Sequence, residues 1–286
     1  LKGAVDSHGK LVAWQDHFVT LGVETDERPG RGANISDGEF PGHFVPNFKL
    51  DQSILNTRIP IGWWRAPGSC SIAFVTQSFI DELAHEAAVD PLEFKLNLLS
   101  SGPPPDPESR RPGYHGGRMS AVVKLAAEKI GYGQELPKGE GIGVAFHFSH
   151  LGYVAVGAHV SVSTYGALRV KRTVAAVDVG ETIMNLSGAE NQVEGSIVDA
   201  ISTAMGLQIT VANGAVQQSN FHDYPLLRLP DTPEIETHFI STPFPTTGLG
   251  EPAFPPVAPA IGNAVFAATG KRMRSMPFNQ HDLSWG

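Results

Sequence analysis

Glycine and proline interrupt this chain at short intervals, and this feature restricts its fold more than any other. The 286 residues include 31 glycines and 22 prolines, a content that favours turns and irregular loops over long helices. Between these breaks, apolar residues recur with the helical period at about 71–88, 90–99, 119–131, 189–206 and 256–270. Strand-like alternation occurs at 1–23, 142–177 and 234–240. Helices in ones and twos among strands predict an α+β fold.

Local signals mark several boundaries. Asp90 is placed to cap a helix, and Gly270 is placed to end one. The run SSGPPPDPESRRPG at 100–113 is typical of a solvated connector. We therefore expect two parts, one at 1–112 and one at 113–286.

Charge and cysteine content exclude several functions. The formal net charge is −8 and no basic run occurs, so binding to nucleic acid is not expected. Cys70 is the single cysteine, which rules out an internal disulfide and a cysteine-based zinc or iron–sulfur site within this chain. No run of about 18 apolar residues predicts a membrane span. The opening LKGAVDSHGKLVAW has the pattern of a strand-turn-strand unit without an initiator Met or signal peptide, which suggests a processed product or one subunit of a divided protein.

A single glutamate, Glu251, stands in the apolar stretch TGLGEPAFPPVA at 247–258. Gly248 and Gly250 allow another group to approach the backbone closely, and Pro252 holds the residue before it extended. A carboxylate in apolar surroundings has a raised pKa and can act as a general base. A structural turn whose glutamate points to solvent remains the alternative.

A second unusual stretch is GWWRAPGS at 62–69, where Trp63, Trp64 and Arg65 lie on a loop directly before a helix. The free N–H groups of a helix N-terminus suit an anion or a cofactor oxygen. Gln192, at the start of a later helix, could donate its amide to a polar ligand. A core loop with a paired arginine, and a surface cap at the glutamine, are the alternatives.

Two clusters of polar residues do not form convincing sites. Ser219, His222 and Asp223 are too close in sequence for a serine-hydrolase triad, and no G-x-S-x-G elbow is present. His147 and His150 lie three apart in a strand-like segment, so we expect them to point to opposite faces rather than to bind a metal together.

Several motifs follow one another in a fixed order along the chain. They are GWWRAPG, FVTQSFIDELAHEAAVDPLEFKLNLL, KGEGIGVAFHFSHLGYVA, VAAVDVG, NQVEG, QSNFHDYPLLR and GLGEPAFPPVAPAIGNAVFAATGKRMRSMP. The series, from about Leu1 to Pro277, resembles the molybdenum-cofactor subunit of the xanthine dehydrogenase and aldehyde oxidase family. It is most similar to the isoquinoline 1-oxidoreductase beta-subunit branch. The resemblance implies the C-terminal portion of α+β molybdenum-cofactor-binding domains of the molybdenum hydroxylase type, packed around a molybdopterin cytosine dinucleotide.

The same resemblance implies a molybdenum-dependent oxidoreductase that hydroxylates an aldehyde or N-heterocyclic carbon with oxygen from water. Glu251 matches the glutamate of the family's GxGEP motif, which takes the proton from the metal-bound hydroxyl. The loop from Arg65 to Gly68 matches a loop near the substrate, and Gln192 matches the glutamine of the QxEG motif. The expected cofactor contacts are Arg65, Ala66, Gly68, Gln192 and Gly250. No side chain is expected to bind the metal directly.

Three aromatic residues are candidates for a substrate pocket, namely Trp63, Trp64 and Phe254; a place in the core is the alternative for each. The chain also departs from the branch at three points. Ala66-Pro67 stands where the branch has Ser-Val, and Pro67 removes a backbone donor. His159 replaces an acid, and Leu186 replaces the proline that usually follows Asn185.

The branch's large subunit is more than twice as long as this chain, and its GQG, GGGFG and TQ segments have no counterpart here. The resemblance therefore implies the C-terminal part of a divided or proteolysed large subunit. We expect the N-terminal part as a separate chain, a small iron–sulfur subunit with 2Fe–2S clusters, and a small-molecule substrate.

Other functions stay open at this point. The same fold could lack molybdenum and serve as a non-redox enzyme or as a binding or assembly module. A hydrolase that uses Ser219 or Cys70 is a weaker possibility. The sequence leaves undetermined the substrate, the electron acceptor and the compartment, for which the bacterial cytoplasm and the periplasm both fit.

Overall fold

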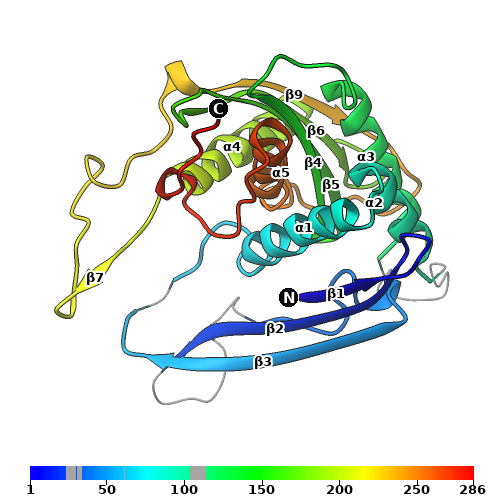
Figure 1. Ribbon diagram of the computed structural model, residues 1–286, viewed down its shortest axis with the longest axis horizontal. Coiled ribbons are helices and arrows are strands. Elements are labelled where there is room, and N and C mark those ends of the chain that lie inside the picture. Colours follow the sequence, from blue (N-terminus) through cyan, green and yellow to red (C-terminus); the bar gives the residue numbers. More distant parts are fainter. Residues whose placement is uncertain (24–29, 31–33, 61, 104–113) are drawn as a thin grey trace.

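The computed structural model describes residues 1–23, 30, 34–60, 62–103 and 114–286. These residues form two main β-sheets, with helices between and around them (Figure 1). The mixed arrangement confirms the α+β class. The predicted connector lies mostly outside the described residues, so the division at 112 stays a prediction.

The first sheet has three strands in the order β1-β2-β3. β1 (Lys2–Val5) and β2 (Leu11–Val23) form an antiparallel hairpin. β3 (Asn47–Thr57) pairs with β2 in parallel along its whole length. The sheet forms the lower layer of the molecule in Figure 1.

The second sheet is the centre of the fold and has the order β4-β5-β6-β9. β4 (Glu140–Ser149), β5 (Gly152–Val162) and β6 (Leu168–Asp178) form an antiparallel meander. β9 (Glu234–Phe239) joins the far edge, parallel to β6. β4 to β6 are buried over most of their length, as near-continuous apolar runs predict for strands covered on both faces.

Helices cover both faces of this second sheet (Figure 1). α4 (Leu186–Met205) and α5 (Val257–Thr269) share one hydrophobic core with it. α3 (Gly116–Ile130) packs on the other face, with α2 (Pro91–Ser100) against it. α1 (Ser69–Glu86) lies between the two sheets and contacts α5 and β4.

The predicted helix caps form. The Asp90 carboxylate accepts hydrogen bonds from the backbone N–H groups of Leu92 and Glu93, at 2.9 and 3.0 Å, and satisfies donors that the first turn of α2 leaves unpaired. Gly270 ends α5 with a left-handed φ of 74°. These boundaries follow from local chemistry alone.

Close packing of α5 on β4 depends on a glycine. A Cβ at Gly143 would lie 2.3 Å from the Ala260 carbonyl oxygen and 2.4 Å from the Ala264 nitrogen. Only a residue without a side chain permits this approach of helix to strand. The packing brings the turn that precedes α5, and Glu251 with it, to the end of the sheet.

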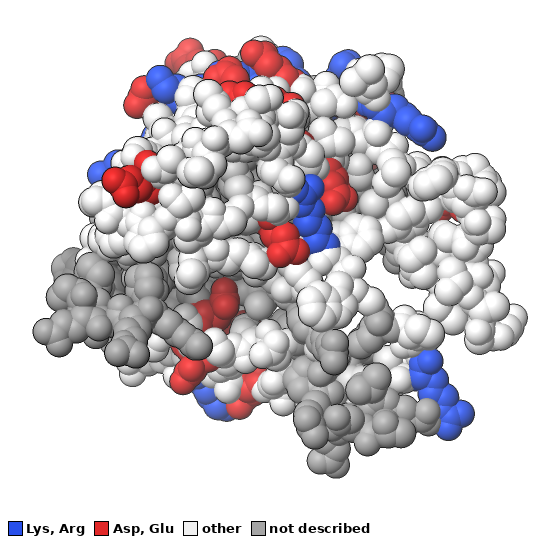
Figure 2. Space-filling view, turned by 180° about the vertical axis from the view of Figure 1, so that it is seen from behind, with Lys and Arg blue, Asp and Glu red and all other residues white. Residues whose placement is uncertain are grey.

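A small hairpin of β7 (Val211–Ala212) and β8 (Ala215–Val216) projects from the body of the molecule (Figure 1). Seen from behind, lysine and arginine side chains are interspersed with aspartate and glutamate over the described surface (Figure 2). Among the described helices, none has the length and apolar character that a membrane crossing requires.

Candidate functional site

Both oxygens of the Glu251 carboxylate have a partner. Oε1 accepts a hydrogen bond from the backbone N–H of Ala66 at 3.0 Å, and Oε2 lies 2.7 Å from Nε2 of His150. The Glu251 side chain remains 36% exposed. The expected apolar surroundings are therefore incorrect in one respect, because a polar ring borders the carboxylate directly.

Arg65 joins two other residues that the motifs singled out. Its Nε and Nη2 both donate to the Gly250 carbonyl oxygen, at 2.8 and 2.6 Å. Nη2 also donates to Oε1 of Gln192 at 3.1 Å and to the Gln192 carbonyl at 3.3 Å. The loop before α1, the second turn of α4 and the GxGEP stretch thus meet at one guanidinium group. Gln192 was expected at the start of its helix, but α4 already begins at Leu186. The backbone N–H of Ala66 donates to Glu251; a contact of Ala66 with the cofactor stays a prediction.

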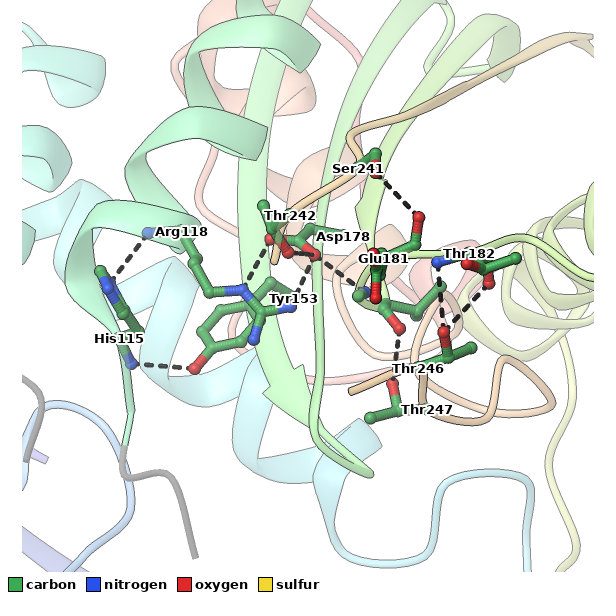
Figure 3. Close-up of polar contacts among 12 residues, drawn as sticks. His115, Arg118, Tyr153, Asp178, Glu181, Thr182, Ser241, Thr242, Thr246 and Thr247 are labelled. Carbon is green, nitrogen blue, oxygen red and sulfur yellow. Dashed lines mark hydrogen bonds and ion pairs between the residues drawn. The ribbon is translucent and has the colours of Figure 1, made fainter. Parts of the chain in front are cut away.

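A buried ion pair anchors the segment that leads to Glu251 (Figure 3). Arg118 of α3 donates two hydrogen bonds to Asp178 at the end of β6, and their side chains are 7% and 1% exposed. Thr242 and the Gly180 N–H also donate to Asp178, at 2.8 and 3.0 Å. Burial acts to raise the pKa of Asp178, but these hydrogen bonds outweigh it and hold the pKa below its ordinary value.

The chain beyond Asp178 then runs alongside residues 241–247 (Figure 3). The N–H of Thr247 donates to the Val179 carbonyl at 2.8 Å, and the N–H of Glu181 donates to the Phe244 carbonyl at 2.9 Å. Gly180 has a φ of 106°, and a Cβ there would lie 2.5 Å from the Pro245 carbonyl oxygen. This contact requires glycine. The paired segments deliver Gly250 and Glu251 to the end of the sheet.

The three aromatic pocket candidates lie in different environments. Trp64 lines a hollow of about 590 Å³ together with Pro67, Gly68 and strand β2. Trp63 is 70% exposed. Phe254 is 3% exposed and belongs to the hydrophobic core, so within this chain it supports the turn at Glu251 instead of lining an open pocket.

The departures from the family pattern have local structural consequences. His159 of β5 lies 2.7 Å from the Glu140 carboxylate on β4, so an acid is present on the neighbouring strand. Asn185 caps α4 through its side chain, which accepts the Gly188 N–H at 3.0 Å. Leu186 occupies the first helical position, where proline is also favoured.

The histidines at 147 and 150 have different roles. His147 lies in β4, where burial lowers its pKa to about 3. His150 lies beyond the last residue of β4, in the turn to β5, with a φ of 53°. The alternation rule therefore did not apply to His150, and sequence reasoning missed its contact with Glu251. No signal in HFSHLGYV marks where the strand ends.

The remaining polar cluster forms an exposed turn. Asp223 accepts hydrogen bonds from the Ser219 hydroxyl at 3.1 Å and from the backbone N–H groups of Ser219 and Asn220. The Ser219 hydroxyl thus bonds to the carboxylate and not to the ring of His222. Among the described residues, no group of three or more His, Cys, Asp or Glu side chains could hold a metal ion.

The sequence matches known proteins over most of its length. The family model of the molybdopterin cofactor-binding domain matches residues 81–233, more than half of the chain. The chain is 32% identical over 234 residues to the membrane-bound aldehyde dehydrogenase (pyrroloquinoline-quinone) of Gluconacetobacter polyoxogenes, covering 79% of this chain and 30% of that protein. It is 29% identical over 244 residues to isoquinoline 1-oxidoreductase subunit beta of Brevundimonas diminuta, covering 84% and 29%. The chain thus spans less than a third of the length of these relatives.

Solved structures share the fold. The Cu,Mo-CO dehydrogenase matches with a TM-score of 0.76 at 14% identity, over 96% of this chain and 60% of that one. The aldehyde oxidoreductase of Desulfovibrio gigas matches with a TM-score of 0.72 at 13% identity, over 96% and 47%. Fold, motif order and family match agree: the chain belongs to the molybdopterin cofactor-binding domain family.

Proposed function

We propose that this chain is the C-terminal part of the large subunit of a molybdenum hydroxylase. The reaction is oxidative hydroxylation of an aldehyde or N-heterocyclic carbon, with water as the oxygen source. The main support is the Glu251 carboxylate, which is oriented at both oxygens and remains partly exposed beside Arg65 and Gly250. The relatives named an aldehyde dehydrogenase and an isoquinoline oxidoreductase indicate the substrate class.

The residues around Glu251 fit a cofactor that approaches the backbone closely. A Cβ placed on Gly248 or Gly250 would meet nothing within 4 Å, so this stretch is open to a bound group. Gln192 is exposed, and its Oε1 accepts a hydrogen bond from Arg65, which leaves its amide N–H donors for a ligand. Molybdopterin cytosine dinucleotide with molybdenum would supply the two-electron oxidation when bound here.

The chain itself supplies the base and its orientation. Glu251 takes a proton during the reaction, and general bases of this kind typically accelerate a step by about 10²–10⁴-fold. The Arg65 contact to Gly250 fixes the residue before the base, and the Ala66 N–H fixes one carboxylate oxygen. Orientation matters because proton transfer requires hydrogen-bonding distance.

Partner chains complete the enzyme in this proposal. The N-terminal part of the large subunit, as a separate polypeptide, would hold most of the cofactor. A small subunit with 2Fe–2S clusters would carry electrons away, since Cys70 is the single cysteine here and such clusters need several. The relatives include proteins named as subunits, which supports a multi-chain assembly.

The decisive experiment replaces Glu251 by glutamine in the native complex. We expect turnover of an aldehyde or N-heterocycle to fall by at least about 100-fold, while molybdenum and pterin contents stay unchanged. Glu128→Gln is the matched control, because Glu128 is 72% exposed on α3. Turnover within a few fold of the wild type would contradict the role of Glu251. An active complex without molybdenum or pterin would instead favour a non-redox use of the fold.

A further inference from the structure

The contact between His150 and Glu251 comes from an unusual backbone. β4 and β5 pair up to Ser149 and Gly152, so His150 and Leu151 form a two-residue turn. Their φ angles are 53° and 61°. A turn with two left-handed residues is ordinarily built from Asn and Gly, because a Cβ is crowded in that conformation.

The other partner of the carboxylate is also in this conformation. Ala66, which donates its N–H to Oε1, has a φ of 55° and is fully buried. Both groups that hold Glu251 are thus presented by non-glycine residues in a disfavoured backbone region. Such conformations cluster at functional sites, where the surrounding structure maintains them.

Stability does not account for this arrangement. The side chains of His150 and Glu251 are 42% and 36% exposed, and ion pairs at such exposure contribute little to folding. Glycine at position 150 would adopt the same positive φ without strain. The substitution would lose only a partly exposed contact. The ring is therefore present at a net cost to the fold.

We infer that His150 is a positioning residue for Glu251. Its ring fixes Oε2 at 2.7 Å while the Ala66 N–H fixes Oε1, so the plane of the carboxylate is set from two sides. The two supports come from the loop before α1 and from the β4–β5 turn. This inference rests on the proposed role of Glu251 as the base.

The test compares three substitutions at His150 in the complete enzyme. His150→Ala and His150→Gly remove the ring, and we expect kcat to fall about 10- to 100-fold with KM within about twofold. His150→Gln retains an N–H donor and should recover most of the lost kcat. His150→Gly should also raise the melting temperature, since glycine accepts a positive φ without strain. A merely structural histidine would instead lose kcat and melting temperature together.

A second readout does not depend on turnover. Hydrogen exchange of the peptide that contains Ala66 reports the hydrogen bond to Oε1, because Pro67 contributes no N–H. If His150 holds the carboxylate, His150→Ala should raise exchange at Ala66, and Glu251→Ala, which removes the acceptor, gives the upper limit. Leu151→Asn is the control, since it relaxes the same turn without touching Glu251, and it should leave kcat and exchange unchanged.

The possible failures are distinguishable. If Glu251→Gln abolishes turnover while His150→Ala and His150→Gly stay within twofold of the wild type, the positioning role is wrong and the proposed function stands. Unchanged exchange at Ala66 in His150→Ala would also overturn it. If Glu251→Gln retains turnover, the proposed function itself fails.

Discussion

Arg118 and Asp178 form a buried ion pair with two parallel hydrogen bonds, 2.7 Å from Nε to Oδ2 and 2.6 Å from Nη2 to Oδ1. The guanidinium group also lies between two rings, 4.3 Å from the centroid of Tyr153 and 4.4 Å from that of Phe244. The pair connects α3, the end of β6 and the segment ahead of Glu251. It therefore links the hydrophobic core to the site.

Replacement of Asp178 by asparagine should destabilise the protein by about 3–5 kcal/mol, because it leaves the charge of Arg118 buried without a counterion. Urea denaturation measures the loss, and hydrogen exchange at 241–247 should rise with it. Glu82→Gln is the control. It breaks an ion pair with Arg274, whose side chain is 73% exposed, and should cost about 1 kcal/mol or less. Equal losses in the two variants would contradict the anchoring role.

Gly180→Ala should reduce the stability of the protein more than alanine does at a glycine that has a positive φ but open space around it. The new Cβ would lie 2.5 Å from the Pro245 carbonyl oxygen, in addition to the strain of a φ of 106°. Gly133→Ala isolates the strain, since Gly133 has a φ of 86° and open space around it. We expect about 1–2 kcal/mol for Gly133→Ala and a clearly larger loss for Gly180→Ala, measured by thermal unfolding. Similar losses would show that residues 179–182 do not hold 242–247 closely.

The pH dependence of stability should reveal Glu39, which lies 3.9 Å from the ring of His147. Burial raises the pKa of Glu39 from 4.5 to about 7, so the folded state retains a proton that the unfolded chain releases. Stability from this group is complete below pH 4.5 and is lost as the pH rises to about 7. As the pH rises from 4 to 8, the free energy of unfolding of Glu39→Gln should therefore increase by about 2 kcal/mol relative to that of the wild type. This is less than the full pKa shift implies, because the Glu39 side chain is 29% exposed.

His147 should produce the opposite trend. Burial lowers its pKa from 6.5 to about 3, so the unfolded chain binds a proton that the folded state excludes. Stability therefore falls as the pH drops from about 6.5 to about 3, and His147→Phe should weaken this acid limb. Denaturation curves at several pH values test both variants. If stability varies with pH in the same way in the wild type and in Glu39→Gln, the raised pKa of the buried Glu39 carboxyl is wrong.

Replacing Lys95 should destabilise the protein less than replacing its buried partner Asp81. Asp81 binds Lys95 through Oδ1 at 2.9 Å and Arg272 through Oδ2 at 2.6 Å, and the Lys95 side chain is 1% exposed. Asp81→Asn leaves a buried ammonium group unpaired and should cost about 3–5 kcal/mol. Lys95→Met should cost much less, because Arg272 still neutralises Asp81. Chemical denaturation measures the stability of both variants. An equal loss of stability would show that Arg272 does not compensate for the missing Lys95.

Sequence reasoning performed well where a feature depends on neighbours along the chain. The helical periods located the five α-helices of the described residues, and Asp90 and Gly270 marked boundaries that the structure confirms. A hydrophobic period reports which side of an element is buried, and a cap needs only the adjacent turn. The resemblance selected Arg65, Gln192 and Gly250, and the structure brings these three residues into contact. Their roles at a cofactor stay predictions.

Taken by itself, the sequence determined the fold class, the helices and the identity of one unusual glutamate. The tertiary structure alone decided what that glutamate touches. The Ala66 N–H that holds its Oε1 lies 185 positions away in the chain, and the His150 ring reaches Oε2 only because β4 ends at Ser149. Local patterns determine which elements form and which faces they bury. The meeting of groups from the loop before α1, the β4–β5 turn and the turn before α5 depends instead on how the helices and the sheet pack, and no short stretch of sequence encodes that.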